Sequence, residues 1–395
     1  MIKRKKKNKE HNPFYDPTLK KRHVSAKRFK KFTLTSLIFS VAFLAFFLFD
    51  MIGKGIPAFN VAFIKVDVTF NEKTLEDTRF AVPTEYRNLV SRAALRDLPK
   101  LLEENPTYMN STQNIWILAS SQVDQYIKNH NHNLKDKDIA KVDELYAQGL
   151  IDKKFNAIFF ENGDSKIPEY AGIFSAVIGS ILTLIITMAV AFPIGVMTAI
   201  YLEEFALDNK FTRFIEININ NLAAIPSILF GLLGLAIFIN LFGMPRSSPL
   251  VGGLTLALMT LPIIIVSSRA ALRAVPDSIR QAGYGLGLNK IQVTRDHVLP
   301  LAFPGIMTGS IIGLAQAMGE TAPLIIIGMI AFIPDAPSMV TQAATVMPAQ
   351  LFTWAGMPEG MYIEKTAAGI LVLLTILISL NAIAIYLRKK FEVKW

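Results

Sequence analysis

Residues 170–202 read YAGIFSAVIGSILTLIITMAVAFPIGVMTAIYL and contain no Asp, Glu, Lys or Arg. The hydrocarbon core of a bilayer needs about 20 consecutive apolar residues per helix, so this run is long enough to cross a membrane. It has no polar face, whereas a helix of a soluble protein usually keeps one. The stretch therefore predicts a membrane-spanning helix rather than a buried core helix of a soluble protein.

Further runs of the same kind occur along the 395 residues, of which 52% are hydrophobic and only 18% charged. One of them, 297–334, is interrupted only by Glu320. From these runs we predict an all-α membrane protein with six transmembrane helices. The expected helices are 32–52, 171–201, 222–242, 250–267, 301–332 and 367–387.

Residues 336–358 are also free of charge and are a candidate for a seventh span. Their prolines and glutamines favour a loop instead, and a seventh crossing would place the two basic termini on opposite sides. We expect a loop with a short interfacial helix at 350–355, in which Phe352 and Trp354 lie at the lipid headgroups.

The positive charge of the chain is concentrated at its ends and in particular loops. Residues 1–31 hold 13 Lys and Arg against Glu10 and Asp16, more than the whole net charge of +10. A basic flank before an apolar helix is typical of the cytoplasmic side, which argues against nucleic-acid binding. The first span is too long for a signal peptide and no small-residue cleavage site follows it, so we expect a retained anchor. With both termini inside, the predicted inner loops also carry most of the remaining basic residues, whereas the short outer loops carry only Arg246 and, at the membrane edge, Lys365.

Residues 53–169 form the longest polar segment, with 15 basic and 17 acidic residues. Apolar and polar residues alternate over 64–70, which predicts a strand, and 85–104 and 139–151 read as helices. A second strand is expected around 155–159, ending at a turn on Asn162 and Gly163. We predict an inserted extracytoplasmic α+β domain between a first span (32–52), which follows the tail (1–31), and a transmembrane domain (170–390). His130 and His132 are a weak metal candidate, because such a pair in a polar loop is usually solvated.

Enzyme signatures are missing from the chain. It has no cysteine, no Gly-Lys-Ser/Thr phosphate-binding loop, no His-Glu-x-x-His and no Gly-x-Ser-x-Gly. We expect no catalytic residue, no metal and no cofactor. Any work that the protein does must therefore come from a partner or a gradient.

The most informative polar loop lies between the fourth and fifth expected helices. Residues 278–300 read SIRQAGYGLGLNKIQVTRDHVLP. The pattern predicts a short helix with a small-residue face, a glycine turn, and a second amphipathic helix that enters the membrane. Small residues allow another protein to approach the backbone closely, although an ordinary interfacial loop would read similarly.

This loop resembles the coupling loop of ABC importer permeases, whose pattern is Glu-Ala-Ala, three residues, Gly and a distal Leu-Pro. Gln281 stands where that family usually has Glu, which puts any charge pairing there in doubt, and Gly283 replaces the second Ala. Three further segments, 193–204, 226–234 and 319–324, together with the loop resemble the A-type permease of phosphate importers (PstA) over residues 171–387. The resemblance implies contact with a cytoplasmic ATPase through Gln281, Ala282, Gly283 and Gly287, with Leu299 and Pro300 closing the loop.

Within the membrane, Glu320 is the residue of most interest, because a carboxylate near the bilayer centre costs roughly 2.5–3.5 kcal/mol or more unless it is paired or protonated. It reads equally well as a pathway residue and as a structural anchor. Members of the family often carry Arg one turn earlier, where this chain has Gln316. The translocation-path candidates are Glu320, Gln316, Thr321, Asn218, Asn220 and Asn221. Gly305, Gly309 and Gly313 form a stripe that favours close helix packing.

The resemblance implies an importer with a second, PstC-like permease, two PstB-like ATPases and an external PstS-like phosphate-binding protein, in a bacterial inner membrane. ATP-driven closure of the ATPases would push the coupling loops and rock the helices between inward and outward access. Two alternatives stay open: a permease for molybdate, sulfate or phosphonate, and a membrane phosphate sensor. The short termini leave no room for a kinase or DNA-binding output domain, which weighs against the sensor.

Overall fold

The computed structural model describes residues 18–330 and 332–391, and the first part of the predicted basic tail lies outside the described residues. The chain divides into two units, residues 1–53 and 54–395. From Leu19 onward, the first unit is a single helix, α1 (Leu19–Gly55), which continues into the second unit. This helix begins well before the predicted span, because residues 19–31, which precede the apolar run, contain neither Pro nor Gly and continue the same helix.

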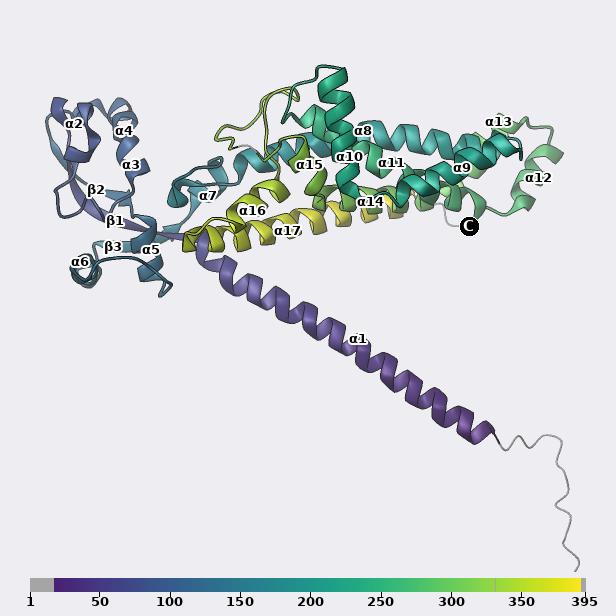
Figure 1. The fold of residues 1–395 in the computed structure, drawn as a ribbon, viewed down its shortest axis with the longest axis horizontal. Helices are drawn as coiled ribbons and strands as arrows, with labels where there is room; N and C mark the ends of the chain where they lie inside the picture. The colour runs from purple at the N-terminus through teal and green to yellow at the C-terminus, as the bar shows by residue number, and fades with distance from the viewer. Residues whose placement is uncertain (1–17, 331, 392–395) are drawn as a thin grey trace, which may run out of the picture. The chain divides into compact units, whose positions relative to one another are not determined.

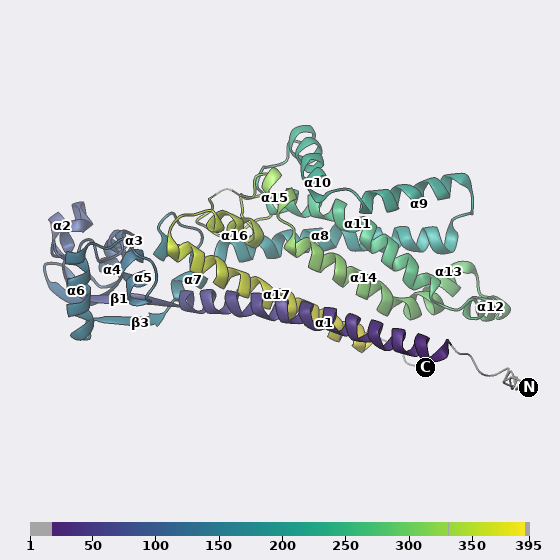
Figure 2. The ribbon, with the colours of Figure 1, turned by 60° about the horizontal axis from the view of Figure 1, so that its bottom comes forward.

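The second unit opens with a small α+β part built on three antiparallel strands, drawn at one end of the ribbon in Figures 1 and 2. The strands are β1 (Asn60–Thr69), β2 (Thr112–Leu118) and β3 (Ile151–Phe155), in the order β2-β1-β3. Ile64 of β1 lies opposite Ile117 on one side and Ile151 on the other. The strand predicted over 64–70 is confirmed, and its buried apolar residues form the core of this part.

Short helices surround this sheet: η1 (Ile56–Phe59), α2 (Glu72–Glu76), η2 (Thr78–Ala81), α3 (Arg92–Arg96), α4 (Leu98–Glu104), η3 (Pro106–Tyr108), α5 (Ser121–Ile127), α6 (Asp136–Ala147), α7 (Ala157–Glu161) and η4 (Pro168–Tyr170). The helix predicted over 85–104 is wrong in extent, because only α3 and α4 form and Pro99 lies in the first turn of the second of them. The strand expected around 155–159 is also wrong. β3 ends at Phe155, and the Asn156 side chain accepts a hydrogen bond from the backbone of Phe159 and caps α7.

Among the described residues, five helices are long and apolar enough to cross a membrane, or six if one bent pair counts as a span. Besides α1 these are α8 (Phe174–Ile200), α11 (Pro249–Arg273), α14 (Leu299–Gly319) and α17 (Gly360–Phe391). A π-helical turn, η5 (Tyr201–Phe205), extends α8. The spans predicted at 171–201, 250–267 and 367–387 are therefore continuous helices.

The span predicted at 222–242 is broken. α9 (Lys210–Ala223) and α10 (Ser227–Gly234), continued by η6 (Leu235–Leu241), meet at an angle of 103°. Pro226 lies at the break, where it lacks a backbone donor and disfavours helical geometry in the residue before it. α9 is amphipathic, whereas α10 and η6 are apolar.

The span predicted at 301–332 ends early, because α14 stops at Gly319 and Glu320 has extended backbone angles. A short helix, α15 (Ala322–Ile326), follows. The loop helix expected at 350–355 is present as α16 (Met347–Ala355). Phe352 is exposed, but Trp354 is buried against Phe159 and Tyr362 and donates to Asp164, so its expected place at the headgroups is wrong.

α11 lies between α8 and α14, as Figure 2 shows. Gly305 and Gly309 of α14 face α11, and a methyl group on Gly305 would lie 2.6 Å from Cβ of Ala271. At Gly309 such a group would overlap Ser267. Gly313 meets Ile264 at ordinary contact distance. The glycine stripe thus lies where two helix backbones approach closely.

Candidate functional site

The polar loop after α11 folds as a helical hairpin. α12 (Asp277–Gly285) leads into Gly287, whose φ of +81° is left-handed, and α13 (Lys290–Val293) follows. The Asn289 side chain and Gln292 form a capping box at the start of α13. Gly283 packs on Val293, where a methyl group would lie 2.8 Å from Cγ2. Glycine is therefore needed at two positions, once for the turn and once for the contact between the helices. We call residues 277–298 the hairpin.

The tip of the hairpin is exposed and partly apolar. Gln281, Ala282 and Gly287 are exposed, whereas Gly283 is buried inside the hairpin. Leu286 is 79% exposed and Ile291 63%. A hollow of about 350 Å³ lies beside them. It is lined by Ile279, Ala282, Gly283, Leu286, Asp296, His297, Pro300 and Leu301. Leu286 and the other apolar residues of this hollow form a contiguous apolar patch, of the kind that marks an interaction surface.

Arg280 fixes the hairpin to the helix ends. Its guanidinium lies 2.7 Å from Glu204, which follows α8 in η5. The same group donates to the carbonyl oxygens of Val275 at 2.7 Å and Leu272 at 3.0 Å. The Glu204 side chain is only 4% exposed. A buried, multiply bonded guanidinium of this kind holds its neighbours in one geometry.

A second ion-pair cluster joins α9, α11 and the end of α8. Arg269 lies 3.3 Å from Glu203 and 2.5 Å from Glu216, and Arg273 lies 2.7 Å from Glu203. Arg269 and Glu203 are mostly buried. Glu216 of α9 is therefore engaged in this cluster. Neither cluster was predicted, because their members are separated by 53 to 76 positions in the sequence.

The candidates for a transport path lie around the break after α14. Gln316 is exposed and Glu320 half-buried, and no described residue forms a hydrogen bond or ion pair with either side chain. Thr321 lies at the start of α15. α15 packs on Gly231 of α10, where a methyl group would lie 2.7 Å from Cα of Pro323. The short helix after the break at Glu320 thus packs on α10, which itself follows the break at Pro226.

The asparagines predicted with Glu320 lie on α9. Asn218, Asn220 and Asn221 are exposed, and Asn218 donates to the backbone oxygen of Phe214 at 2.7 Å. Among the described residues no hydrogen bond connects these asparagines with Gln316 or Glu320. The predicted path candidates therefore form two groups. One lies around the break after α14, and the other consists of the asparagines on α9.

A buried polar network joins the α+β part to the first turns of α17. Lys128 lies 2.6 Å from Asp124 and 3.1 Å from Glu364. Gln125 and His130 each bond the other oxygen of Glu364, at 2.6 and 2.5 Å. Because His130 pairs with Glu364 and His132 packs on the Tyr126 ring, the two histidines do not converge on a metal. No group of three metal-ligating side chains occurs among the residues searched.

Lys365 is part of the same region. Its side chain is buried and donates to the backbone oxygens of Glu169 at 3.2 Å and Ala171 at 2.5 Å. Burial also raises the pKa of Glu169. The segment before α8 is thereby attached to α17.

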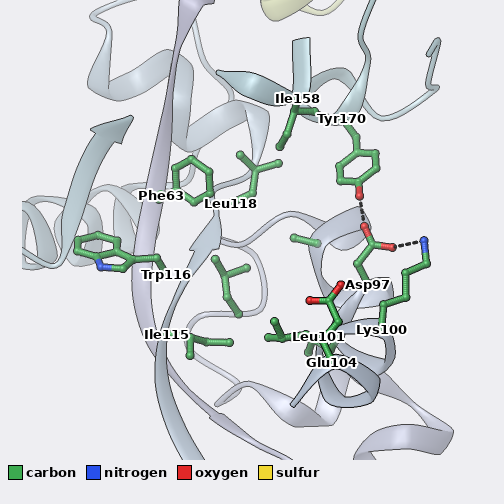
Figure 3. Close-up of a pocket in the computed structure, with 13 residues that line it drawn as sticks. Phe63, Asp97, Lys100, Leu101, Glu104, Ile115, Trp116, Leu118, Ile158 and Tyr170 are labelled. Atoms are coloured by element: carbon green, nitrogen blue, oxygen red, sulfur yellow. Dashed lines mark hydrogen bonds and ion pairs between the residues drawn. The ribbon is translucent and has the colours of Figure 1, made fainter. Parts of the chain in front are cut away.

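A hollow of about 380 Å³ lies on the α+β part (Figure 3). Its lining is mostly apolar, with Phe63, Trp116 and Leu101 around it. Tyr170 donates to Asp97, and burial with this hydrogen bond raises the pKa of Tyr170 to about 12. Carboxylates on an apolar wall give no attraction for an anion.

Apolar helices of this length and number define a multi-pass membrane protein. Residues 191–393 match the family described as binding-protein-dependent transport system inner membrane component. This match covers just over half of the chain, which therefore belongs to that family of inner-membrane permeases. Residues 16–86 and 81–136 match a domain of unknown function, DUF3333.

Curated relatives lie in the same family. The PstA phosphate transport permease of Mycobacterium leprae is 36% identical over 40% of this chain and 52% of its own length. The probable ABC transporter permease YqgI of Bacillus subtilis is 33% identical, over 42% and 56%. The chain thus spans about half the length of these two relatives. The PstA of Yersinia pestis is 30% identical over 61% of this chain and 81% of its own length. The predicted resemblance to PstA-type permeases is confirmed.

Among solved structures, the inward-facing MetNI methionine transporter overlaps 56% of this chain and 94% of its own, at 14% identity and a TM-score of 0.42. This overlap is too loose to transfer details of architecture.

Proposed function

We propose that the chain is the permease subunit of an ATP-driven phosphate importer, in which it forms half of the translocation path. The observation that carries this proposal is the hairpin, whose exposed tip is attached to the membrane helices through Arg280 and Glu204. Such a part can transmit force from another protein. The curated relatives named as PstA permeases support phosphate as the transported ion.

The two ion-pair clusters give the force a route. A displacement of α12 acts on the end of α8 through Arg280 and Glu204. The neighbouring Glu203 is tied to Arg269, which also holds Glu216 of α9. Movement of the hairpin therefore acts on α8, α9 and α11 together, because partly buried ion pairs do not give way easily.

The partners follow from this arrangement. A PstB-like ATPase would dock on Gln281, Ala282, Leu286 and Gly287 of the hairpin tip, and a second copy would serve a PstC-like permease. The hairpin and both termini would then be cytoplasmic. The α+β part, which is joined to the opposite end of α8 and α17, would be extracytoplasmic, where a PstS-like protein delivers phosphate.

The path would pass the break between α14 and α15. A carboxylate does not attract an anion, so Glu320 needs a proton or a cation. We infer that the second permease supplies this partner, or that Glu320 accepts a hydrogen bond from a protonated phosphate oxygen. Gln316 and Thr321 can donate to phosphate at the same place. The asparagines of α9 belong to the cytoplasmic part of the path.

Uptake of labelled phosphate tests the function. Deletion of the gene should abolish high-affinity uptake and leave low-affinity uptake intact, and the restored wild-type gene should recover it. Unchanged uptake would reject the proposal. Loss of labelled molybdate, sulfate or phosphonate uptake on deletion, with phosphate uptake unchanged, would assign the permease to another oxyanion.

Gly287→Val is expected to weaken ATPase copurification in detergent. A side chain at left-handed φ costs about 1–2 kcal/mol, which corresponds to about 5- to 30-fold in the population of the docking geometry. Gly285→Val is the matched control, because Gly285 lies two residues away, has no positive φ and faces open space. Equal copurification of the wild type and Gly287→Val would refute the docking assignment.

A further inference from the structure

The α+β part carries a second hollow, of about 640 Å³, formed by η2, the segment after it and α3. Four arginines line it. The lining residues are Asp77, Thr78, Arg79, Phe80, Arg87, Asn88, Arg92, Leu95 and Arg96. We call it the arginine hollow. None of its lining residues belongs to the hairpin or to the candidates for the transport path.

The only carboxylate among the described residues that line the arginine hollow is that of Asp77, and both of its oxygens are bonded to Arg79. Arg79 donates to both oxygens of Asp77, at 2.7 to 3.1 Å. These bonds hold the pKa of Asp77 below its ordinary value. The pair is neutral overall, so three positive charges line the hollow without a counter-charge.

The three remaining arginines are not neutralised by the carboxylates nearby in the sequence. No described residue forms an ion pair or a side-chain hydrogen bond with Arg92 or Arg96. Asp97, the next residue, points to Tyr170 and Lys100, as Figure 3 shows. Glu85, on the other side, lies 3.8 Å from Lys141.

The positions of these arginines bring like charges together. Arg92 and Arg96 are one helical turn apart on α3, where two positive charges repel each other. Arg87 is held over the Phe80 ring, 4.9 Å from its centre, and donates to the backbone oxygen of Val82 at 3.4 Å. Such a gathering is unfavourable by itself and becomes favourable when an anion occupies the space between the cations.

We propose that the arginine hollow binds an oxyanion of the phosphate class through Arg87, Arg92 and Arg96, with the Asn88 amide as a further donor. Guanidinium groups offer paired N–H donors whose spacing matches two oxygens of a phosphate, and this match favours phosphate over spherical anions such as chloride. The volume accommodates inorganic phosphate with water, or the phosphate group of a larger molecule such as a lipid. The proposal rests on the proposed function, because that function brings phosphate to the side of the membrane where this part lies.

The proposal is tested by measuring the binding of inorganic phosphate to the purified full chain in neutral detergent. The method is equilibrium dialysis at low salt. The variant Arg92→Gln/Arg96→Gln should bind phosphate about tenfold more weakly or not at all, because two charge-assisted donors are lost. Both side chains are exposed, so the melting temperature should not fall. The control Lys100→Gln/Lys153→Gln removes two charges from the same part outside the hollow and should bind like the wild type.

Sedimentation with vesicles that contain phosphatidylglycerol distinguishes the two sources of phosphate. Sedimentation that depends on Arg92 and Arg96, without binding of free phosphate, assigns the hollow to a lipid headgroup and supports the proposal. The proposal is overturned if the wild type and the arginine variant bind phosphate equally and also bind vesicles equally. This holds even if the variant loses binding to an acidic partner protein. Phosphate uptake by cells that carry the arginine variant tests the permease function separately. Normal uptake by a variant that no longer binds phosphate in the hollow is consistent with the permease function.

Discussion

Arg280→Met is expected to detach the hairpin from the membrane helices and to abolish ATPase copurification. The substitution leaves the Glu204 carboxylate, only 4% exposed, without its cation. Breaking a buried pair by removing one partner costs about 3–5 kcal/mol, and the backbone oxygens of Leu272 and Val275 lose their donor as well. Hydrogen exchange should accelerate across residues 277–298 before it changes elsewhere, since the lost contacts are centred on this segment.

Arg295→Met is the matched control within the hairpin. Arg295 also forms an arginine–carboxylate pair, with Asp296, but both side chains are well exposed to solvent. Exposed pairs contribute little, so exchange and copurification should stay at the wild-type level. The double variant Arg280→Met/Glu204→Met should recover part of the protection, because no buried charge then remains unpaired. Wild-type exchange in Arg280→Met would show that the pair does not hold the hairpin.

The contrast between the apolar runs and their breaks shows what sequence patterns can reveal. Length and composition predicted α8, α11 and α17 because these properties are local. Pro193 and Pro262 lie inside continuous helices, whereas Pro226 lies at the break between α9 and α10. The local sequence does not determine whether a helix continues through a proline or breaks there. Neighbouring helices decide this, because they can satisfy the backbone carbonyl groups that lose a hydrogen-bond donor. Here α10 turns away to pack on α15.

The same distinction applies to the candidate site. The hairpin was predictable from its small residues and from Gly287, since a turn is encoded within a few positions. The burial of Lys365 was not predicted, because it depends on carbonyl oxygens nearly 200 positions earlier in the chain. Without an alignment, a single sequence gives no indication of such pairings.

Lys128→Met is expected to loosen the α+β part from α17, with an effect as large as that of Arg280→Met. Lys128 is the cation between two buried carboxylates, those of Asp124 and Glu364. Their side chains are 0% and 6% exposed. Removing the shared cation should cost about 3–5 kcal/mol, seen as a lower melting temperature and faster exchange over α5 and the start of α17.

The loss should depend on pH, and its direction follows from Asp124. Burial raises the pKa of Asp124 in the folded protein, and Lys128 opposes that rise. Without Lys128 the folded-state pKa rises further, so the folded state holds its proton more tightly than the unfolded state does. A raised carboxylate pKa makes stability fall as pH increases from the unfolded value of 3.8 towards the folded value. This makes the loss smaller at pH 5 than at pH 8.

Melting curves of the detergent-purified chain at the two pH values measure this difference. Lys141→Met is the control, because Lys141 pairs with Glu85 and Glu144, which are both exposed. Its curves should match the wild type at both pH values. The double variant Lys128→Met/Glu364→Gln should lie between the wild type and Lys128→Met, since one of the two uncompensated charges is then absent. An equal loss in Lys128→Met and Lys141→Met would mean that general charge, rather than this buried network, holds the α+β part to α17.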